Sequence, residues 1–428
     1  MEIKPNYKDT EVGLIPEDWD VLSLGKITSI QRGKFSARPR NDPKYYGGDF
    51  PFIQTGDVRR SGGLITSFTQ TLNNDGLLVS RLFPKGTLFF TIAANIGDVG
   101  IAVFEASCPD SLVAIVPGAA VEKVWLLYEL AHRKESFERL ASPGAQLNLS
   151  LEKLRPYLIP VPTRPEQRAI AAALRDVDAL LGALDLLVAK KRDLKQAAMQ
   201  QLLTGQTRLP GFQGEWEMKT LGDLFSFSGG YSASRDQLST EGQCYLHYGD
   251  IHGSTKTSVD ARTDYQDIPK LDVPLKRVSS GSLLKDGDVV FVDASEDDEG
   301  TSRHVVVVNK DNVPFISGLH TIVAKSKTDE LVHEYRQYCF QTAAIREQFL
   351  FYAVGTKVSG ISKTNIPKLK LPLPSAPEQT AIAALLTDMD AELAALTQRL
   401  AKTRALKQGM MQELLTGRTR LVFAEVAA

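Results

Sequence analysis

The sequence predicts an α+β protein in which two pseudo-repeated globular domains are separated by two long antiparallel helices that form a coiled coil. A segment that begins at Pro165 recurs without a gap from Pro377, with roughly 29 of 45 positions identical. Its apolar residues follow a heptad spacing. The stretches before each copy contain short apolar runs that are bounded by turn residues.

Length and composition point to a globular protein. The chain has 428 residues, of which 43% are hydrophobic and 24% are charged, and this length suits roughly two to four domains. No apolar run approaches the ~18 residues of a membrane helix, and the first residues lack the apolar core of a signal peptide. Cys108, Cys244 and Cys339 are too far apart for a paired-cysteine zinc site. We therefore expect a reducing, cytoplasmic setting.

Each copy of the repeat carries the signals of a long helix. A proline opens it, and Glu166 or Glu378 stands in the first turn, where the helix dipole favours an anion. Gly205 or Gly417 follows the last apolar pair and suits a C-terminal cap. The first helix is expected over residues 165–203, which is long for a globular protein.

The heptad seam predicts that the two helices pair with each other. Because a globular block lies between them, the pairing is expected to be antiparallel, with the two blocks at opposite ends. Two alternatives stay open, namely that each helix packs only on its own domain, or that the seams pair between two copies of the chain. The predicted seam residues are Ile170, Leu174, Val177, Leu181, Leu184, Val188, Ile382, Leu386, Met389, Leu393, Leu396 and Leu400. After a slip in register, the seam is expected to continue through Leu194, Ala198, Leu406 and Met410.

The two globular blocks are expected to form twisted mixed sheets with helices. Strand-like apolar runs lie at residues 87–93, 101–104, 113–116, 289–292, 305–308 and 321–324. Gly-Asp and Lys-Gly turns separate them, and a helical pattern follows at residues 124–140 and 331–349. This order favours an α+β block in each half.

Polar loops at the same place in both blocks suggest contact with DNA. The formal net charge of −1 argues against non-specific binding of a polyanion, so contacts have to come from local patches. Arg can pair with guanine, Gln and Asn with adenine, and Lys with phosphate, although any single exposed Arg or Lys is more often only solvated surface. The expected DNA-binding residues are Gln31, Arg32, Lys34, Phe35, Arg38, Arg40, Arg59, Arg60, Gln146, Asn148, Tyr231, Ser232, Ser234, Arg235, His247, Tyr248, Lys256, Arg303, Lys357 and Lys363.

Signatures of catalysis are missing from the sequence. There is no phosphate-binding G-x-x-x-x-G-K-[ST] loop and no Asn/Asp-Pro-Pro-aromatic motif of amino-methyltransferases. His247, His252, His304 and His320 lack the spacing of a metal site. The acidic run at residues 293–299 is more often an exposed loop than a nuclease centre. We expect no catalytic residue and no metal ligand.

These motifs together resemble the specificity subunits of type I DNA restriction–modification systems. The resemblance rests on GLIPEDW near the start and on the related blocks PFIQTGDV and CYLHYGDI. It also rests on the two helices that begin PEQRAIA and PEQTAIA and end LLTGQTRL and LLTGRTRL. It covers nearly the whole chain, and the helical motif is the most specific part.

The resemblance implies a division of labour along the chain. Target recognition domain 1 would span residues 1–164 and target recognition domain 2 residues 210–376. Conserved spacer helices would span residues 165–209 and 377–428, the latter with the C-terminal tail. Each recognition domain would read one half of a bipartite site in double-stranded DNA. The helices would set the gap and dock two methyltransferase subunits, to which restriction/translocase subunits add.

The same resemblance implies that the chain binds no cofactor itself. S-adenosylmethionine, ATP and Mg²⁺ would belong to the partner subunits. Two other functions are weighed against this one. The first is a stand-alone methyltransferase or nuclease with an unrecognised motif, and the second is a coiled-coil adaptor that joins two proteins without contacting DNA.

Overall fold

The computed structural model describes residues 6–93, 95–141, 148–254, 256–295, 302–353 and 359–421. The chain divides into two compact units. The first comprises Met1–Asp185 and Gln398–Ala428, and the second comprises Leu186–Thr397. Each unit therefore combines one globular block with a portion of each long helix, α7 (Arg164–Leu202) and α12 (Ala376–Leu414).

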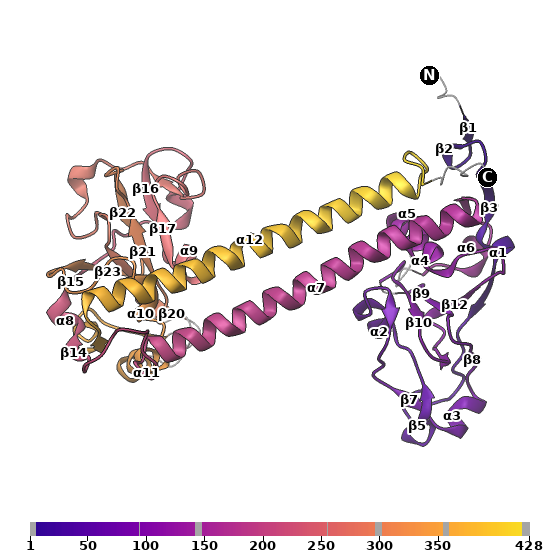
Figure 1. Ribbon diagram of the computed structural model, residues 1–428, viewed down its shortest axis with the longest axis horizontal. Coiled ribbons are helices and arrows are strands. Elements are labelled where there is room, and N and C mark those ends of the chain that lie inside the picture. The colour runs from indigo at the N-terminus through magenta and orange to yellow at the C-terminus, as the bar shows by residue number, and fades with distance from the viewer. Residues whose placement is uncertain are drawn as a thin grey trace. The chain divides into compact units, whose positions relative to one another are not determined.

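A five-stranded sheet forms the centre of the first unit (Figure 1). Its strands run in the order β4 (Thr28–Arg32), β12 (Leu112–Pro117), β9 (Leu88–Thr91), β10 (Val99–Ala102) and β6 (Leu64–Ile65), and only the pair of β10 and β6 is parallel. Strands β9 and β10 are buried on both faces, so successive residues enter different cores. Phe90 lies in one apolar cluster with Trp125, whereas Phe89 lies in another with Ile53.

Shorter elements complete the first unit. Its other strands are β1 (Tyr7–Thr10), β2 (Gly13–Pro16), β3 (Asp20–Ser23), β5 (Tyr46–Pro51), β7 (Thr71–Leu72), β8 (Leu82–Phe83), β11 (Ala106–Ser107) and β13 (Leu158–Val161). Its other helices are α1 (Leu24–Ile27), α2 (Thr55–Arg60), α3 (Asn74–Leu78), α4 (Lys123–His132), α5 (Lys134–Leu140), α6 (Leu151–Leu154) and the 3-10 turn η1 (Pro43–Tyr45).

The second unit repeats the sheet of the first. The order is β15 (Phe225–Gly229), β23 (Thr321–Ser326), β19 (Val289–Val292), β21 (His304–Val308) and β17 (Ser258–Asp260), and again only the last pair is parallel. Its other strands are β14 (Glu217–Thr220), β16 (Gln243–Leu246), β18 (Lys270–Leu271), β20 (Ala294–Ser295), β22 (Phe315–Ser317), β24 (Ser359–Gly360) and β25 (Lys370–Leu373). Its helices are α8 (Leu221–Leu224), α9 (Tyr248–His252), α10 (Arg336–Cys339), α11 (Ala343–Tyr352), η2 (Arg235–Gln237), η3 (Leu275–Arg277) and η5 (Ile366–Lys368).

The predicted strand-like runs all fall on strands of the two sheets, and the run at residues 289–292 matches β19 at both ends. The predicted helical stretches differ from the structure, because each is interrupted. Residues 124–140 form α4 and α5, which meet at Arg133. Residues 331–349 contain α10 and most of α11, with a turn between them. A continuous apolar pattern hid both breaks.

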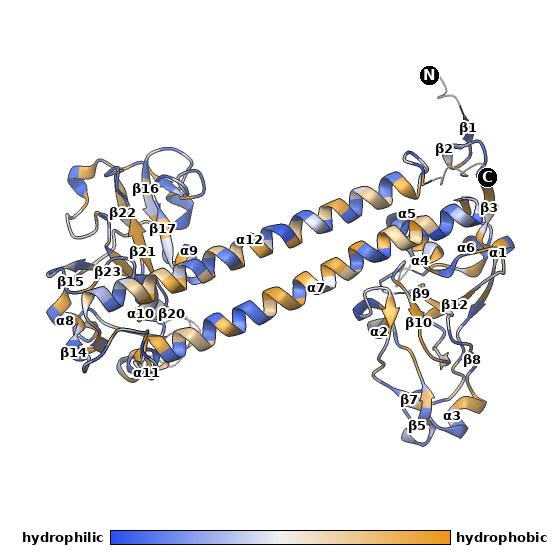
Figure 2. Cartoon of the chain, in the orientation of Figure 1, coloured by the Kyte–Doolittle hydropathy of each residue, from blue (hydrophilic) through white to orange (hydrophobic). Residues whose placement is uncertain are grey.

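Segments of α7 and α12 lie antiparallel within each unit. In the first unit, Asp178 pairs with Lys407 at 2.6 Å and Asp185 with Arg404 at 2.9 Å. From the first pair to the second, the residue number rises along α7 and falls along α12, so the two segments are antiparallel. In the second unit, Lys191 pairs with Glu392 at 2.7 Å and Lys195 with Asp390 at 2.5 Å, in the same sense. Bands of hydrophobic and hydrophilic residues alternate along both helices (Figure 2).

The twelve predicted seam residues are all buried or half-buried. The predicted continuation through Leu194 and Leu406 is wrong, because these side chains are 47% and 59% exposed. Lys191, Lys195, Thr403 and Lys407 stand on the less exposed face instead, and three of them form the ion pairs just described. The prediction followed the spacing of apolar residues and therefore chose the leucines, whereas in the structure lysines in ion pairs occupy the inward positions. Ala198 and Met410 are half-buried against the apolar cores.

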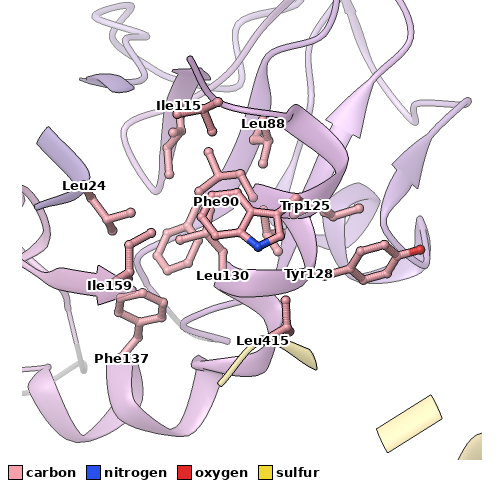
Figure 3. Close-up of a cluster of buried hydrophobic side chains, with 14 of the residues drawn as sticks. Leu24, Leu88, Phe90, Ile115, Trp125, Tyr128, Leu130, Phe137, Ile159 and Leu415 are labelled. Atoms are coloured by element: carbon pink, nitrogen blue, oxygen red, sulfur yellow. The ribbon is translucent and has the colours of Figure 1, made fainter. Parts of the chain in front are cut away.

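A buried carboxylate ties the start of each long helix to the segment that follows the other helix. Glu166 accepts hydrogen bonds from Trp19 Nε1 at 2.8 Å and from Arg420 Nε at 2.8 Å. Figure 3 shows the neighbouring core of the first unit, in which Leu415 approaches the side chains around Trp125. Leu415, directly after α12, therefore belongs to the core of the first unit, and Leu421 packs against it.

The second unit repeats this arrangement with its own residues. Glu378 accepts hydrogen bonds from Arg208 Nη2 at 2.6 Å and from Trp216 Nε1 at 3.2 Å. Hydrogen bonding to Glu378 raises the pKa of Arg208. In each unit, the glutamate near the start of a long helix thus accepts hydrogen bonds from one arginine and one tryptophan.

Candidate nucleic-acid interface

The predicted DNA-binding loops gather at one edge of each five-stranded sheet. In the first unit, Arg32 at the end of β4 pairs with Val113, and Thr91 at the end of β9 pairs with Leu112. The residues that follow β4 and β9 and those that precede β12 therefore lie together. We call residues 31–40, 92–93 and 110–111 the first reading edge.

The second unit places the corresponding residues in the same way. Gly229 at the end of β15 pairs with Ile322, and Val292 at the end of β19 pairs with Thr321. We call residues 229–235, 293 and 319–320 the second reading edge. Both edges follow from the same antiparallel register, so the side chains that they present can differ while the backbone frame is kept.

Asp110 organises the first reading edge. Its side chain pairs with Arg40 at 2.7 Å, and its carbonyl accepts from Arg32 Nε at 2.7 Å. The loop starts at Gly33, where a Cβ would lie 2.2 Å from the carbonyl oxygen of Pro109. Only glycine fits such a close approach of two backbones. The motif QRGK thus contains a packing requirement as well as exposed polar side chains.

The other predicted residues of the first loop have different surroundings. Gln31 is exposed and accepts from Arg81 Nη1 at 2.9 Å. Lys34 is exposed, and Arg38 Nη1 donates to the carbonyl of Ala37 at 2.7 Å. Phe35 requires a correction, since it is only 5% exposed and packs with Tyr46 and Phe52. It supports the loop from inside and is not placed to meet DNA.

The related motifs TGD and YGD open the short helices α2 and α9. Asp57 is buried, accepts from the backbone N–H of Gln54 at 2.9 Å and pairs with Arg60 at 2.8 Å. Asp250 pairs instead with Arg235 at 2.7 Å, and so links α9 to the second reading edge. Arg59 and Arg60 are both exposed.

The second reading edge combines hydroxyl and aromatic groups. Tyr231 is half-buried and its backbone N–H donates to the carbonyl of Ser317 at 2.7 Å, whereas Ser232, Ser234 and Arg235 are exposed. His247 is only 6% exposed, and its Nδ1 accepts from the backbone N–H of Gly249 at 3.1 Å. The prediction that His247 contacts DNA is therefore corrected, because this side chain caps α9. Burial lowers the pKa of His247.

The remaining predicted residues lie on neighbouring segments. Lys256 is exposed and pairs with Asp264 at 2.7 Å. Arg303 is half-buried and donates to the carbonyls of His252 and Ser254. Asn148 and Lys363 are exposed, and Tyr248 stacks on His247 with ring centroids 4.6 Å apart. Gln146 and Lys357 lie outside the described residues.

Most of the predicted cations already have a partner within the protein. An aspartate pairs with each of Arg40, Arg60, Arg235 and Lys256. The aspartates that pair with the three arginines lie in the first reading edge or in α2 and α9, whereas the aspartate that pairs with Lys256 lies elsewhere. An exposed pair of this kind contributes little to stability. It does hold a guanidinium in one orientation while leaving further N–H groups free, which suits recognition of a planar base edge.

Other features of the described residues argue for structural roles. His304 is buried among aromatic rings, its Nε2 lies 3.2 Å from the carbonyl oxygen of Arg336, and burial lowers its pKa to about 4. Burial also raises the pKa of Cys339. Within the described ranges, no cluster of His, Cys, Asp or Glu could hold a metal ion. No helix there has both the length and the apolar character needed to cross a membrane.

Sequence reasoning missed the residues that organise the edges. Asp110 and His320 lie just before strands, and neither belongs to a motif that the two blocks share. Asp293 appeared in the sequence only as the first member of an acidic run. An alignment of the equivalent strands in the two blocks could have found these positions, because it shows that all of them lie beside strand ends at the same edge of the sheet.

Comparison with known proteins adds a second line of evidence. The family model described as "Type I restriction modification DNA specificity domain" matches residues 16–185 and 213–403. The putative type I restriction enzyme MjaX specificity subunit of Methanocaldococcus jannaschii is 24% identical over 447 residues, which cover 97% of each chain. The MjaVIII specificity subunit of the same organism is 22% identical, and the alignment covers 97% of this chain and 96% of the relative.

Solved structures show a similar fold. The crystal structure of a type I restriction–modification S subunit from M. genitalium matches with a TM-score of 0.54 at 16% identity, covering 97% of this chain and 98% of that one. A chain from a study of complex assembly and conformational transition of the type I system matches with a TM-score of 0.57, also at 16% identity. That match covers 95% of this chain and 99% of the other.

Proposed function

This chain belongs to the family of type I restriction–modification DNA specificity proteins, and we propose that it reads a two-part DNA sequence, one part with each unit. Its role is that of the subunit that selects the DNA site of a restriction–modification complex. Each reading edge would meet the edges of base pairs in one half of the site. Sequence information in DNA is carried by those edges, whereas phosphate contacts fix position.

The observation that carries the proposal is the pair of reading edges. They arise from the same strand order and the same antiparallel register. Their side chains differ, since Asp110 holds Arg40 at the first edge and Asp250 holds Arg235 at the second. Two readers with one backbone frame and different contacts are what recognition of two dissimilar half-sites requires.

We further propose that α7 and α12 pair along their length as an antiparallel coiled coil that sets the gap between half-sites. Each helix has 39 residues, which corresponds to roughly 58 Å at 1.5 Å per residue. The ion pairs Asp178–Lys407 and Lys195–Asp390 support this, because the same acid–base contact recurs in both units. A rigid spacer loses less entropy on binding two half-sites than a flexible linker does.

The partners and cofactors follow from the same proposal. Two methyltransferase subunits would dock on this chain, and restriction/translocase subunits would join them. S-adenosylmethionine, ATP and Mg²⁺ would act in those partners, and this chain would contribute recognition without catalysis. Because the DNA that it would bind is cellular DNA, we propose that the chain acts in the cytoplasm. A near-neutral chain suits such an assembly, since the partners can share the neutralisation of phosphates.

The test is to map methylated positions in DNA from cells that carry this chain with its methyltransferase subunits. A two-part motif with a fixed gap is expected. Arg235→Ala should change preference in one half only, and Arg38→Ala, at the corresponding place of the first loop, should change the other. Insertion of four residues into α7 after Leu187, with a matching insertion into α12 after Arg399, should change the gap and leave both halves intact.

Four results would contradict the proposal in different ways. If both arginine variants alter the same half, the assignment of one edge to each half is wrong. If the insertion leaves the gap unchanged, the helices do not set it. If the assembled complex selects no sequence from random duplexes, an adaptor role is favoured, and turnover by this chain without partners would favour an enzyme.

A further inference from the structure

The second reading edge contains two side chains, His320 and Asp293, that stand at the end of the sheet. Asp293 follows the last residue of β19 and His320 precedes the first residue of β23. The backbone N–H of Asp293 donates to the carbonyl of His320 at 3.2 Å. The register of the two strands therefore brings an imidazole and a carboxylate together at the edge.

The first reading edge has the same backbone bond and different chemistry. There the backbone N–H of Ile92 donates to the carbonyl of Ser111, also at 3.2 Å. Ile92 is buried in the apolar core. The second unit thus has an imidazole and a carboxylate at the position where the first unit has Ile92 and Ser111, although the backbone hydrogen bond is the same in both units.

The backbone of His320 is in an uncommon conformation. Its φ is +57°, in the left-handed region, and the other non-glycine residues with positive φ in the described ranges are Asn6 and Asn312. Histidine tolerates this region better than most residues, but less well than glycine. Backbone strain of this kind clusters at functional sites, where it directs a side chain. The conformation fixes the direction in which the imidazole leaves the edge.

Neighbouring side chains hold the ring on two sides. His320 Nδ1 lies 3.3 Å from Asp293 Oδ1, an ion-pair distance without the alignment of a hydrogen bond, and this oxygen has no hydrogen-bond partner among the described residues. Tyr248 meets the ring edge to face, with centroids 5.4 Å apart. The side chain of His320 is nevertheless 50% exposed. The ring is oriented by its neighbours and remains accessible to a ligand.

Other charged groups act on the same carboxylate. Burial raises the pKa of Asp293, and the neighbouring His320 and Lys363 oppose that rise. Lys363 is exposed and lies close enough to act on Asp293, and the exposed Arg235 pairs with Asp250 of α9. An anionic ligand such as a DNA backbone would therefore meet cations around a polar group that can distinguish bases.

We propose that His320 is a specificity-determining residue of the second unit and that Asp293 is its positioning residue. His320 Nε2, the ring nitrogen that does not face Asp293, contacts one polar atom of a base edge in the half-site read by this unit. Asp293, whose Oδ1 lies 3.3 Å from Nδ1, orients the ring. This inference rests on the proposed function and adds to it the residue that discriminates at one base pair.

The test uses the assembled complex of this chain with its methyltransferase subunits and a random duplex library. His320→Asn is the main variant, because asparagine tolerates the left-handed backbone and removes the ring nitrogen. It should reduce discrimination at one base pair of the second half roughly 10- to 100-fold, the range for losing one base-edge contact. The first half, the gap and the melting temperature should stay unchanged.

Two further variants separate positioning from structure. Asp293→Asn should weaken discrimination at the same base pair as His320→Asn, whereas Ser111→Ala, at the matching place of the first edge, should leave the second half unaltered. Unchanged discrimination throughout the second half in His320→Asn would overturn the proposal. An effect of Asp293→Asn at a different base pair would overturn its positioning role. If the wild-type complex itself enriches no two-part sequence, the proposed function fails, not this assignment alone.

Discussion

Removal of the Arg420 side chain should selectively weaken the first unit. Glu166 has a side chain that is only 2% exposed, and Arg420 donates to it through Nε at 2.8 Å and Nη2 at 2.9 Å. Arg420→Ala would leave this buried carboxylate with Trp19 Nε1 at 2.8 Å and the backbone N–H of Leu421 at 3.3 Å. Hydrogen bonding to Glu166 also raises the pKa of Arg420, so the pair favours the charged guanidinium.

The magnitude follows from the burial of the two partners. Breaking a fully buried ion pair costs about 3–5 kcal/mol of unfolding free energy. Arg420 is 24% exposed, and two N–H donors remain for Glu166, so we expect a loss of about 2–3 kcal/mol. The additional pair of Arg420 with Asp18 lies at the surface and should add less than about 1 kcal/mol.

The assay is chemical denaturation of the full chain, combined with hydrogen exchange of the segment that follows α12. In Arg420→Ala, amides of residues 415–421 should lose protection while those of residues 203–209 keep it. Arg208→Ala is the matched control, since Arg208 holds Glu378 in the second unit, and it should give the opposite pattern. A double-mutant cycle with Glu166→Gln should show a coupling energy of about 1 kcal/mol or more.

The expectation is refuted by Arg420→Ala with unchanged unfolding free energy and unchanged protection of residues 415–421. Equal loss of protection in both segments would refute the claim that the effect stays within one unit. In either case the buried carboxylate would not be what fixes the end of α12.

Three further perturbations test other parts of the structure. Burial lowers the folded pKa of His304 to about 4, below the value of about 6.5 expected when unfolded. As the pH falls, the unfolded chain therefore binds a proton at this histidine before the folded chain does. The free energy of unfolding should fall by up to about 3 kcal/mol as the pH drops from about 6.5 to 4. His304→Phe should flatten this pH dependence when denaturation is measured at several pH values, and an unchanged slope would contradict the assignment to His304. Leu184→Asp should lower the unfolding free energy by about 3 kcal/mol or more, because Leu184 is only 4% exposed. Leu194→Asp should change the unfolding free energy by under about 0.5 kcal/mol. Equal effects of the two variants in denaturation would mean that both leucines lie on the same face of the helix. Gly230→Ala should disturb the second reading edge, because the added Cβ would lie 1.7 Å from the carbonyl oxygen of Gly318, and selection from random duplexes should show loss in one half only; an unaltered motif would mean that the edge does not contact bases.

The sequence predicted the fold well where a repeat or an apolar period controls it. The helices were expected over residues 165–203 and its copy, and α7 and α12 end within a residue of that range. The run at residues 289–292 became β19 because every residue there is β-branched or aromatic and buried. The breaks beside Arg133 and after Cys339 escaped notice, since tertiary packing sets them and the apolar pattern continues through both.

The candidate site was harder to predict because side-chain partners depend on distant segments. Phe35 looked like part of an exposed loop, yet the aromatic rings around it come from β5 and the residues after it. Leu194 fitted a heptad, but Lys195 takes the inward place through its ion pair with Asp390. His320 carries no local signal at all, because its surroundings arise only when β19 and β23 pair.

The make-up of the first unit has a consequence for synthesis. Residues 398–421 complete the core around Glu166 and Leu415, whereas the second unit is one uninterrupted stretch from Leu186 to Thr397. During translation the block made first therefore cannot close until Leu415 and Arg420 have left the ribosome, although domains ordinarily fold in the order in which they emerge. We expect the nascent chain to acquire protease resistance in its middle before its beginning.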